Sequence, residues 1–118
     1  MIWLTTVRKD GMPTPTPVWF LWEGEGFLIY SQPGTHKLRN LSANIKASLN
    51  LNTDASGDSV AVFTGTVGVA NDAPPALQNP AYLEKYREGI HAIRMTPESF
   101  SKDFSVPLRF HVEKVRAW

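Results

Sequence analysis

Tight turns between successive extended segments constrain this chain more than any other feature of its sequence. Residues 2–8 are predicted as a strand, and Lys9-Asp10-Gly11 follows, in which the Asp-Gly pair is a strong hairpin signal. Residues 15–22 form a second extended segment, which a turn at 23–26 folds back onto a third strand over 27–31. Turns this short join antiparallel strands, so the N-terminal part of the chain is predicted to be an antiparallel sheet.

Proline residues indicate where the second strand lies in that sheet. Pro13, Pro15 and Pro17 fall at alternate positions and therefore remove alternate backbone donors. A strand that lacks donors along one side need not pair on that side. The segment is therefore expected at a sheet edge or at the opening of a strand.

Three helices are expected from their capping residues. Thr35 begins a short helix that runs to about Asn44, and Asn79-Pro80 begins the clearest helix, with a cap followed by proline at the first helical position. Thr96-Pro97-Glu98 begins a third, which runs through Phe104. The expected inner faces are Leu38, Leu41 and Ile45 in the first helix and Leu83, Tyr86, Ile90 and Ile93 in the second.

The remaining strands are predicted over 47–52, 59–70 and 106–115, with a polar loop at 53–58. Gly65 and Gly68 suggest a bulge or sharp coiling in the strand that contains them. A chain of 118 residues has room for one domain. The predicted order, with local connections between most strands, favours a mainly β domain over residues 1–118, with an antiparallel sheet curled toward a barrel.

Composition excludes several classes of function. The net charge is +1, so no strong basic bias argues for nucleic acid, and no apolar run is long enough to cross a bilayer. The absence of cysteine excludes a disulfide scaffold, a cysteine metal site and a thiol nucleophile. No signal peptide is evident, so a cytoplasmic protein is expected.

Motifs for catalysis by side chains are also missing. The chain has no G-x-S-x-G, H-E-x-x-H, G-x-x-x-x-G-K-[ST] or G-x-G-x-x-G pattern, and its three histidines have no partner at ligand spacing. No metal site and no catalytic side chain are therefore expected. If the chain is an enzyme, a bound organic cofactor supplies the difficult step.

The start of the first predicted helix carries an electrostatic anomaly. Lys37 and Arg39 lie in its first turn, where the helix dipole disfavours cations by about 0.3–1 kcal/mol each. An external anion resolves the conflict, because free backbone amides, the Thr35 hydroxyl and Lys37 can together clasp a phosphate. The alternative is that both cations extend into solvent and the helix starts later.

The aromatic run Val18-Trp19-Phe20-Leu21-Trp22 allows two interpretations. A central strand buried on both faces has this composition. A strand that lies along a planar heterocycle has it too, and the turn at 23–26 brings this run close to the Thr35 anion site. A flat ring beside a phosphate describes a flavin-type ligand.

Three motifs together resemble the pyridoxamine 5′-phosphate oxidase-like split-barrel family. They are T-V-R-x-D-G at residues 6–11, P-V-W-F-x-W at 17–22 and Y-S-x-P-x-T-x-K-x-R-N-L at 30–41. More narrowly, the chain resembles the branch that uses the deazaflavin coenzyme F420. The similarity extends over nearly the whole chain, including the final segment from residue 106.

The resemblance implies a six-stranded antiparallel split β-barrel that forms a homodimer with two cofactor sites between subunits. The implied reaction is hydride transfer from reduced F420 to an unsaturated small organic molecule. The alternatives are an FMN-dependent oxidase or reductase and a non-catalytic flavin- or deazaflavin-binding protein. The residues that the resemblance assigns to the cofactor are Val18, Trp19 and Phe20 along the ring, with Tyr30, Ser31, Gln32, Thr35, Lys37 and Asn40 toward the phosphate end.

Two departures from the family pattern are apparent. The resemblance implies a short helix before the first strand, whereas the sequence begins within that strand, so either its start is truncated or this member has lost the helix. His36 stands where flavin-using relatives often have a second basic residue, so weaker and pH-dependent phosphate binding is expected.

Overall fold

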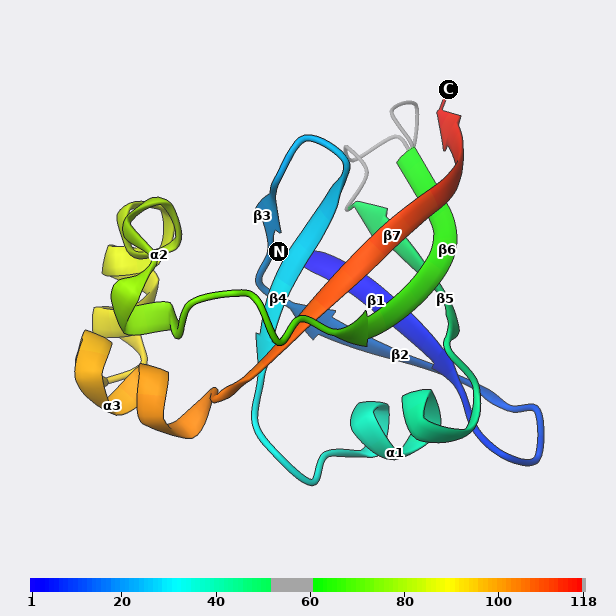
Figure 1. Ribbon diagram of the computed structural model, residues 1–118, viewed down its shortest axis with the longest axis horizontal. Helices are drawn as coiled ribbons and strands as arrows, with labels where there is room; N and C mark the ends of the chain where they lie inside the picture. Colours follow the sequence, from blue (N-terminus) through cyan, green and yellow to red (C-terminus); the bar gives the residue numbers. More distant parts are fainter. Residues whose placement is uncertain (52–60, 118) are drawn as a thin grey trace.

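The computed structural model describes residues 1–51 and 61–117, and the predicted loop at 53–58 lies outside them. Within these residues seven strands form one antiparallel sheet with the order β2-β1-β5-β6-β7-β4-β3 (Figure 1). The strands are β1 (Ile2–Val7), β2 (Pro13–Val18), β3 (Leu21–Trp22), β4 (Gly26–Ser31), β5 (Lys46–Leu51), β6 (Ala61–Val69) and β7 (Val106–Ala117). The helices are α1 (His36–Ala43), α2 (Pro80–Ala92) and α3 (Pro97–Asp103), with a 3₁₀ turn η1 (Ala76–Gln78) before α2.

The connection between β2 and β3 explains why the sheet curls. These strands are the two edges of the sheet, yet only Trp19 and Phe20 separate them in the chain. Three peptide steps span at most about 11 Å, so the two edges must approach each other. The expected split β-barrel is confirmed, and its two edges are joined by this short link rather than by a backbone ladder.

Two details of the strand prediction change. The expected strand over 15–22 is divided at Trp19 and Phe20, so the six predicted strands become seven. The interpretation of residues 18–22 as a central strand is wrong, because the run joins the two edges of the sheet. The edge position predicted from the alternating prolines is confirmed for β2.

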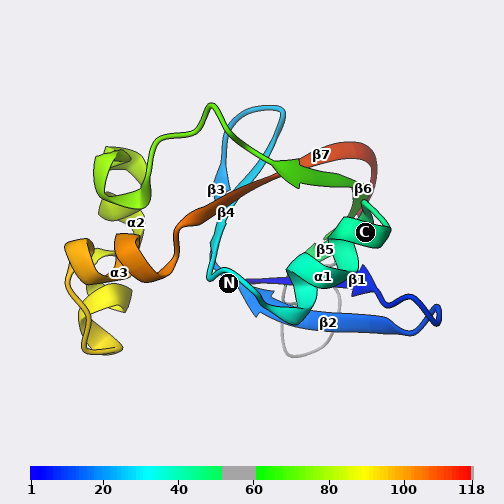
Figure 2. The same ribbon diagram turned by 60° about the horizontal axis from the view of Figure 1, so that its bottom comes forward.

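Strand β4 separates two hydrophobic cores. All six of its residues are buried, and successive side chains point to opposite faces. Phe27 and Ile29 pack inside the barrel, whereas Leu28 and Tyr30 pack against α2 and α3. The turned view in Figure 2 shows these two helices beside β4, outside the barrel. The barrel core contains Ile2, Leu4, Val18, Phe27, Ile29, Leu41, Leu49, Val67, Leu108 and Phe110.

The three helices start where their caps predicted. The Asn79 side chain accepts a hydrogen bond from the Tyr82 backbone N–H at 3.2 Å, and Thr96 forms a reciprocal capping box with Ser99. Thr35 occupies the N-cap position of α1, although its hydroxyl accepts no capping bond.

Two residues on the predicted inner faces are in fact exposed. Ile45 is 55% exposed because α1 ends at Ala43 and Ile45 lies in the link to β5. Ile93 is 48% exposed just beyond the end of α2. The buried stripe of α2 consists instead of Tyr82, Tyr86 and Ile90, spaced four residues apart.

The predicted bulge occurs at the first of the two glycines in β6. The register with β7 shifts between Thr64 and Gly65. A Cβ atom at Gly65 would lie 1.9 Å from the His111 carbonyl oxygen, whereas one at Gly68 would meet nothing within 4 Å. Close approach of two backbones therefore requires glycine at residue 65 and not at residue 68.

These two glycines give a matched pair of stability variants. Gly65→Ala is expected to lower the free energy of unfolding by about 3 kcal/mol or more, because the backbone of β7 has to move. Gly68→Ala is expected to change it by less than about 1 kcal/mol, since its site is open. Urea unfolding followed by circular dichroism measures both, and equal effects of the two changes would contradict this account of the bulge.

Candidate functional site

Four of the nine predicted cofactor residues meet at one cavity. Val18, Trp19, Tyr30 and Lys37 line a space of about 160 Å³, although they come from β2, the link after it, β4 and α1. The other lining residues are Met1, Pro17, Tyr82, Ile93, Phe100 and Phe104. The cavity therefore lies where the barrel meets α2 and α3.

The Trp19 indole forms a fixed wall of this cavity. It stacks on Tyr86 with ring centroids 4.7 Å apart and planes 4° apart, and on Phe100 at 5.6 Å and 18°. A Cβ atom at Gly89 would lie only 3.1 Å from the indole, so the helix backbone closes a third side. Aromatic stacking of this kind adds about 0.5–1.5 kcal/mol per pair beyond the area that it buries.

Phe20 is held by its backbone rather than directed into the cavity. The Tyr86 hydroxyl accepts from the Phe20 N–H and donates to the Phe20 carbonyl oxygen, both at 2.7 Å. Lys85 donates to the same carbonyl at 2.8 Å, and its ammonium lies 3.5 Å from the centre of the Phe20 ring. Burial lowers the pKa of the Lys85 ammonium. Helix α2 thus supplies the hydrogen bonds that the link between the sheet edges does not make within the sheet.

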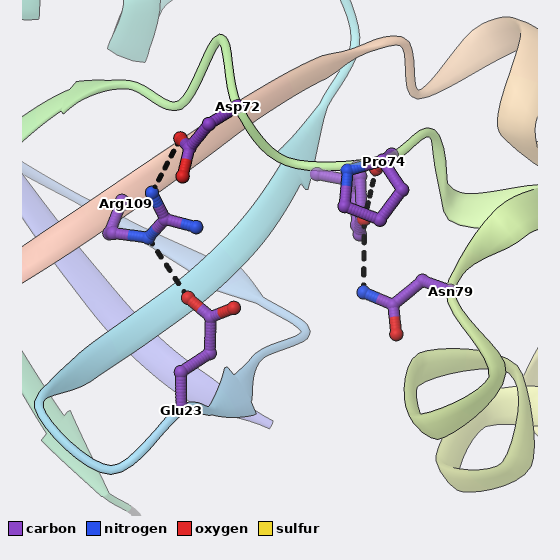
Figure 3. Close-up of polar contacts among 6 residues, drawn as sticks. Glu23, Asp72, Pro74, Asn79 and Arg109 are labelled. Atoms are coloured by element: carbon purple, nitrogen blue, oxygen red, sulfur yellow. Dashed lines mark hydrogen bonds and ion pairs between the residues drawn. The ribbon is translucent and has the colours of Figure 1, made fainter.

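Tyr30 uses its hydroxyl to attach the segment before α2 to strand β4. The hydroxyl donates to the Pro74 carbonyl oxygen at 2.6 Å and accepts from the Asn79 side-chain amide at 3.1 Å (Figure 3). Burial raises the pKa of the Tyr30 phenol, so the hydroxyl stays protonated at neutral pH. Its hydrogen-bonding capacity is largely used within the protein.

Arg109 fixes the same segment from the other side. Figure 3 shows its guanidinium between two carboxylates, with Nε 3.0 Å from Glu23 and Nη1 2.7 Å from Asp72. The hydrogen bond from Arg109 holds the pKa of Asp72 below its usual value. Strand β7 is thereby tied to the β3–β4 turn and to the connection that leads toward α2. Sequence analysis missed this cluster, since its members are far apart in the chain.

Tyr82 is one of the residues that line the cavity, and its buried hydroxyl has no partner. Its side chain is fully buried, and its oxygen is the one buried side-chain polar atom in the described part of the chain without a hydrogen bond. Burial raises the pKa of this phenol strongly, so the proton remains in place. The signal that sequence analysis overlooked is its spacing, four residues before Tyr86.

Lys37 lines the cavity and has no partner for its ammonium among the described residues. Its side chain is half-buried, burial lowers the pKa of its ammonium, and within residues 1–51 and 61–117 it makes no hydrogen bond or ion pair. The first turn of α1 contains no acidic residue, and its backbone amides receive no side-chain cap. Helix α1 does begin at His36, so the alternative that it starts later is wrong.

The neighbouring cation is already engaged. Arg39 donates through Nη1 to the Gly34 carbonyl oxygen at 3.1 Å and through Nη2 to Nδ1 of His36 at 2.8 Å. It folds back onto the loop before α1 instead of extending freely into solvent. Lys37 is therefore the cation of this turn that faces the cavity without a bond to the described residues.

Four predicted residues lie near the cavity without lining it, and a fifth lies elsewhere. Phe20, Ser31, Gln32 and Thr35 belong to the flanking segments, with the Ser31 hydroxyl buried and bonded to the Gln32 carbonyl at 2.8 Å. Asn40 is buried and donates its amide hydrogens to the hydroxyls of Thr6 and Thr14 at 3.0 and 2.8 Å. In this position Asn40 fastens α1 to the β1–β2 hairpin.

The described residues contain no group of three or more His, Cys, Asp or Glu side chains placed to hold a metal ion. None of the described helices has the length and apolarity needed to cross a membrane.

Solved structures with this fold include proteins with different stated roles. A conserved hypothetical protein from Mycobacterium tuberculosis is similar with a TM-score of 0.77 and 20% identity, over 99% of this chain and 75% of that one. An F420 reductase is similar with a TM-score of 0.69 and 21% identity, over 98% and 87%. The heme storage protein HutZ from Vibrio cholerae is similar with a TM-score of 0.66 and 16% identity, over 98% and 83%.

At these identities the structural similarity supports the fold alone. No curated protein matches this sequence. The family model described as pyridoxamine 5′-phosphate oxidase, in contrast, matches residues 1–118. The chain therefore belongs to the pyridoxamine 5′-phosphate oxidase family.

Proposed function

We propose that this protein binds the deazaflavin coenzyme F420 and transfers a hydride from it to an unsaturated small organic molecule in the cytoplasm. One observation carries the proposal. Lys37 is half-buried and unpartnered within the described residues, at the uncapped start of α1 and at the edge of an aromatic cavity. A cation in this setting is costly unless an anion meets it.

The residues present suit a cofactor with a phosphate and a flat ring. Backbone amides at the start of α1 and the Lys37 ammonium are donors that an anion accepts from. Trp19, Phe100 and Phe104 present apolar rings beside them. A flavin phosphate and a deazaflavin phosphodiester both match this donor set.

The side chains at the site bind and orient rather than react. When bound, reduced deazaflavin supplies a hydride, and no protein side chain is obligatory for that step. Val18 and Trp19 are assigned to the ring, and Lys37, with Thr35 and the turn at Ser31 and Gln32, to the phosphate end. Phe20 and Asn40 have a positioning role. The backbone of Phe20 is bonded to Tyr86 and holds the sheet edges, and the Asn40 side-chain amide holds α1 in place.

Two observations favour F420 over FMN. A single unpaired cation at the cavity suits a phosphodiester, whereas the dianionic phosphate of FMN gains more from two converging cations. Beside α1 lies a second, open groove lined by Arg8, Lys9, His36 and Arg39 and also by Asp10, and its excess of basic side chains suits a longer anionic tail. Arg8 is paired with Asp10, so contacts to that tail are weak and exposed.

FMN chemistry and non-catalytic binding remain the competing functions. The family description favours an FMN-dependent oxidase, and similarity to a heme storage protein favours a binder that does not turn over. The cofactor titration described below distinguishes these two functions from the proposed one.

A second copy of the chain is proposed to complete the site. The cavity of about 160 Å³ is smaller than the roughly 300–1,000 Å³ usual for cofactor pockets. Two apolar residues at its rim, Met1 and Ile93, are 58% and 48% exposed. A symmetric dimer that covers this rim would enlarge the pocket and bury both side chains.

Sedimentation velocity tests the dimer. The protein is expected to sediment as a homodimer at micromolar concentration, and Ile93→Glu is expected to shift it toward monomer by placing a charge in the contact. Val115→Glu, which alters a similarly exposed apolar residue far along β7, serves as the comparison. A wild-type monomer would refute the shared site.

Lys37→Ala tests the phosphate contact. Loss of a charge-assisted hydrogen bond is expected to weaken cofactor binding by about 1.5–3 kcal/mol. The unfolding midpoint of the cofactor-free protein is expected to stay the same or rise, because the change removes a desolvated ammonium without a partner. Lys46→Ala, at an exposed position in β5, should bind as wild type does. If Lys37→Ala and Lys46→Ala bind equally well, the anion site is wrong.

Titration with both cofactors distinguishes the competing functions. By fluorescence, F420 is expected to bind more tightly than FMN, and its affinity is expected to fall between low and physiological salt as the tail contacts are screened. Reduced F420 should then be oxidised when an unsaturated acceptor is added. Tight, salt-insensitive FMN binding without measurable F420 affinity would establish the FMN alternative, and binding without oxidation would establish the non-catalytic one.

A further inference from the structure

A separate, apolar groove lies at the end of the barrel that carries α1 (Figure 1). Helix α1, its link to β5 and the adjoining ends of β6 and β7 enclose a space of about 300 Å³. Within the described chain it shares no lining residue with the aromatic cavity. Small-molecule sites usually measure roughly 300–1,000 Å³, and the mouths of β-barrels are one of the places where they occur.

Two residues that the fold leaves unexplained meet at this groove. Ile45 was expected on the inner face of α1 but is 55% exposed, and Gly68 was expected at a bulge but has open space around its Cβ position. A glycine within a strand that no backbone contact requires often marks the close approach of a ligand. Val69, on the same groove, is 57% exposed. Exposed aliphatic side chains around a hollow are typical of a binding site.

The walls of the groove are fixed before any ligand arrives. Leu41, Val67 and Leu108 line it from below and belong to the buried barrel core. The Val67 N–H donates to the Ile45 carbonyl oxygen at 2.9 Å, which holds the link between α1 and β5 against β6. A preformed groove loses little conformational freedom when a ligand binds.

The lining selects an aliphatic ligand. Leucine, isoleucine and valine supply seven of the nine lining residues, and the other two are Ser42 and Gly68. The Ser42 hydroxyl already donates to the Arg39 carbonyl oxygen at 2.7 Å. A polar ring would therefore find neither an aromatic partner nor a free donor among these residues. An alkyl chain needs neither, because burial of each methylene is favourable by itself.

The charge around the groove selects the group at the end of that chain. Residues 35–51, 61–69 and 104–112, which contain all the lining residues, include no acidic side chain. Basic residues stand directly beside lining residues in these ranges, Arg39 after Leu38 and the exposed Lys46 after Ile45. A positive field at the mouth favours an anionic head group over a cationic one.

We propose that this groove binds the alkyl chain of a free anionic amphiphile of the fatty-acid class. The chain lies along Gly68 between α1 and the end of β6, and the carboxylate remains at the solvent-facing mouth. A second copy of the chain matches the groove less well, since the exposed parts of Ile45 and Val69 fall far short of the roughly 800 Å² per partner that a stable interface buries. The site goes beyond the proposed function and does not depend on it.

Calorimetric titration of the full-length, cofactor-free protein with hexanoate, octanoate and decanoate tests the site. At neutral pH and below the micellar concentration, binding with one ligand per chain is expected, and the affinity should rise about fourfold for each added methylene. Affinity that does not change with chain length would overturn the proposal.

Decyltrimethylammonium keeps the chain and reverses the charge of the head group. It is expected to bind at least about threefold more weakly than decanoate at low salt, and the difference should shrink at high salt because the charges at the mouth are screened. Equal or tighter binding of the cationic amphiphile would overturn the anionic assignment.

Gly68→Val fills the groove from within. Its Cβ meets nothing within 4 Å and valine favours strands, so the unfolding midpoint is expected to equal or exceed that of wild type. Decanoate affinity is expected to fall at least about tenfold, because the new side chain occupies the path of the alkyl chain. Thr66→Val places the same side chain two residues earlier in β6, outside the groove, and should bind decanoate as wild type does. Unchanged affinity in Gly68→Val would mean that decanoate binds elsewhere and would overturn the proposal.

Ile45→Ala tests the rim without filling the groove, and it decides the question should Gly68→Val lower the unfolding midpoint. Its affinity for decanoate is expected to fall about threefold or more as apolar contact is lost, whereas Val115→Ala, at a similarly exposed residue, should bind as wild type does. Equal affinities of the two variants would contradict the site.

Sedimentation velocity distinguishes the amphiphile from a second copy. Gly68→Val and Ile45→Ala are both expected to sediment as wild type does. A shift of either variant to a smaller species would show that another chain occupies the groove, and would overturn the proposal. These measurements contain no flavin or deazaflavin. Their failure would leave the proposed function standing, and failure to bind a cofactor would leave the alkyl-chain site standing.

Discussion

The attachment of Trp19 and Phe20 to helix α2 is the constraint on which the rest of the structure depends. These two residues join the opposite edges of the sheet, so they fix how far the barrel closes. Their backbone leaves the sheet at this point, and the Tyr86 hydroxyl and the Lys85 ammonium supply the hydrogen bonds that strand partners supply elsewhere. The Trp19 ring then stacks on both Tyr86 of α2 and Phe100 of α3, which fixes these helices relative to the barrel. The cavity lies beside this link. The stacked Trp19 ring forms one wall, and the exposed side chains of Met1 and Ile93 lie at its rim.

Strand β4 connects the barrel to the helices α2 and α3. It is buried on both faces, so the barrel core and the helical core share one wall. Tyr30 at its end holds the segment before α2, and Arg109 in the neighbouring strand holds the same connection through Asp72 (Figure 3). Two polar clamps from adjacent strands thus position a helix pair that has few backbone contacts with the sheet. Such clamps compensate for the absence of a ladder. The Tyr30 hydroxyl is largely buried, and a satisfied buried bond avoids a desolvation cost of about 1–3 kcal/mol. The Arg109–Asp72 pair is exposed, so it contributes mainly by its geometry.

Local signals predicted the parts of the fold that depend on local physics. The Asp10-Gly11 hairpin, the caps at Asn79 and Thr96 and the bulge at Gly65 follow from the backbone conformations that these residues favour or tolerate. Ile45 was misplaced because periodicity does not show where a helix ends, and the chain turned two residues earlier. Tyr82 and Arg109 were missed because their partners, or their lack of partners, arise only when segments distant in sequence meet. Of the candidate site, the sequence contained the ring-lining and cationic residues but not the cavity that joins Val18, Trp19, Tyr30 and Lys37.

The distribution of satisfied polar groups separates structural residues from functional ones. Asn40 carries a side chain that the family pattern associates with the cofactor, yet both its amide hydrogens are used to hold α1 on the β1–β2 hairpin. Thr35 begins the same helix without a side-chain capping bond, and Lys37 of its first turn lines the cavity. A sequence selected for stability alone would place an acidic or capping side chain at that turn. Lys37 at that turn lowers the stability of the empty protein, and the proposed phosphate-bearing cofactor would recover that stability by binding only the folded state.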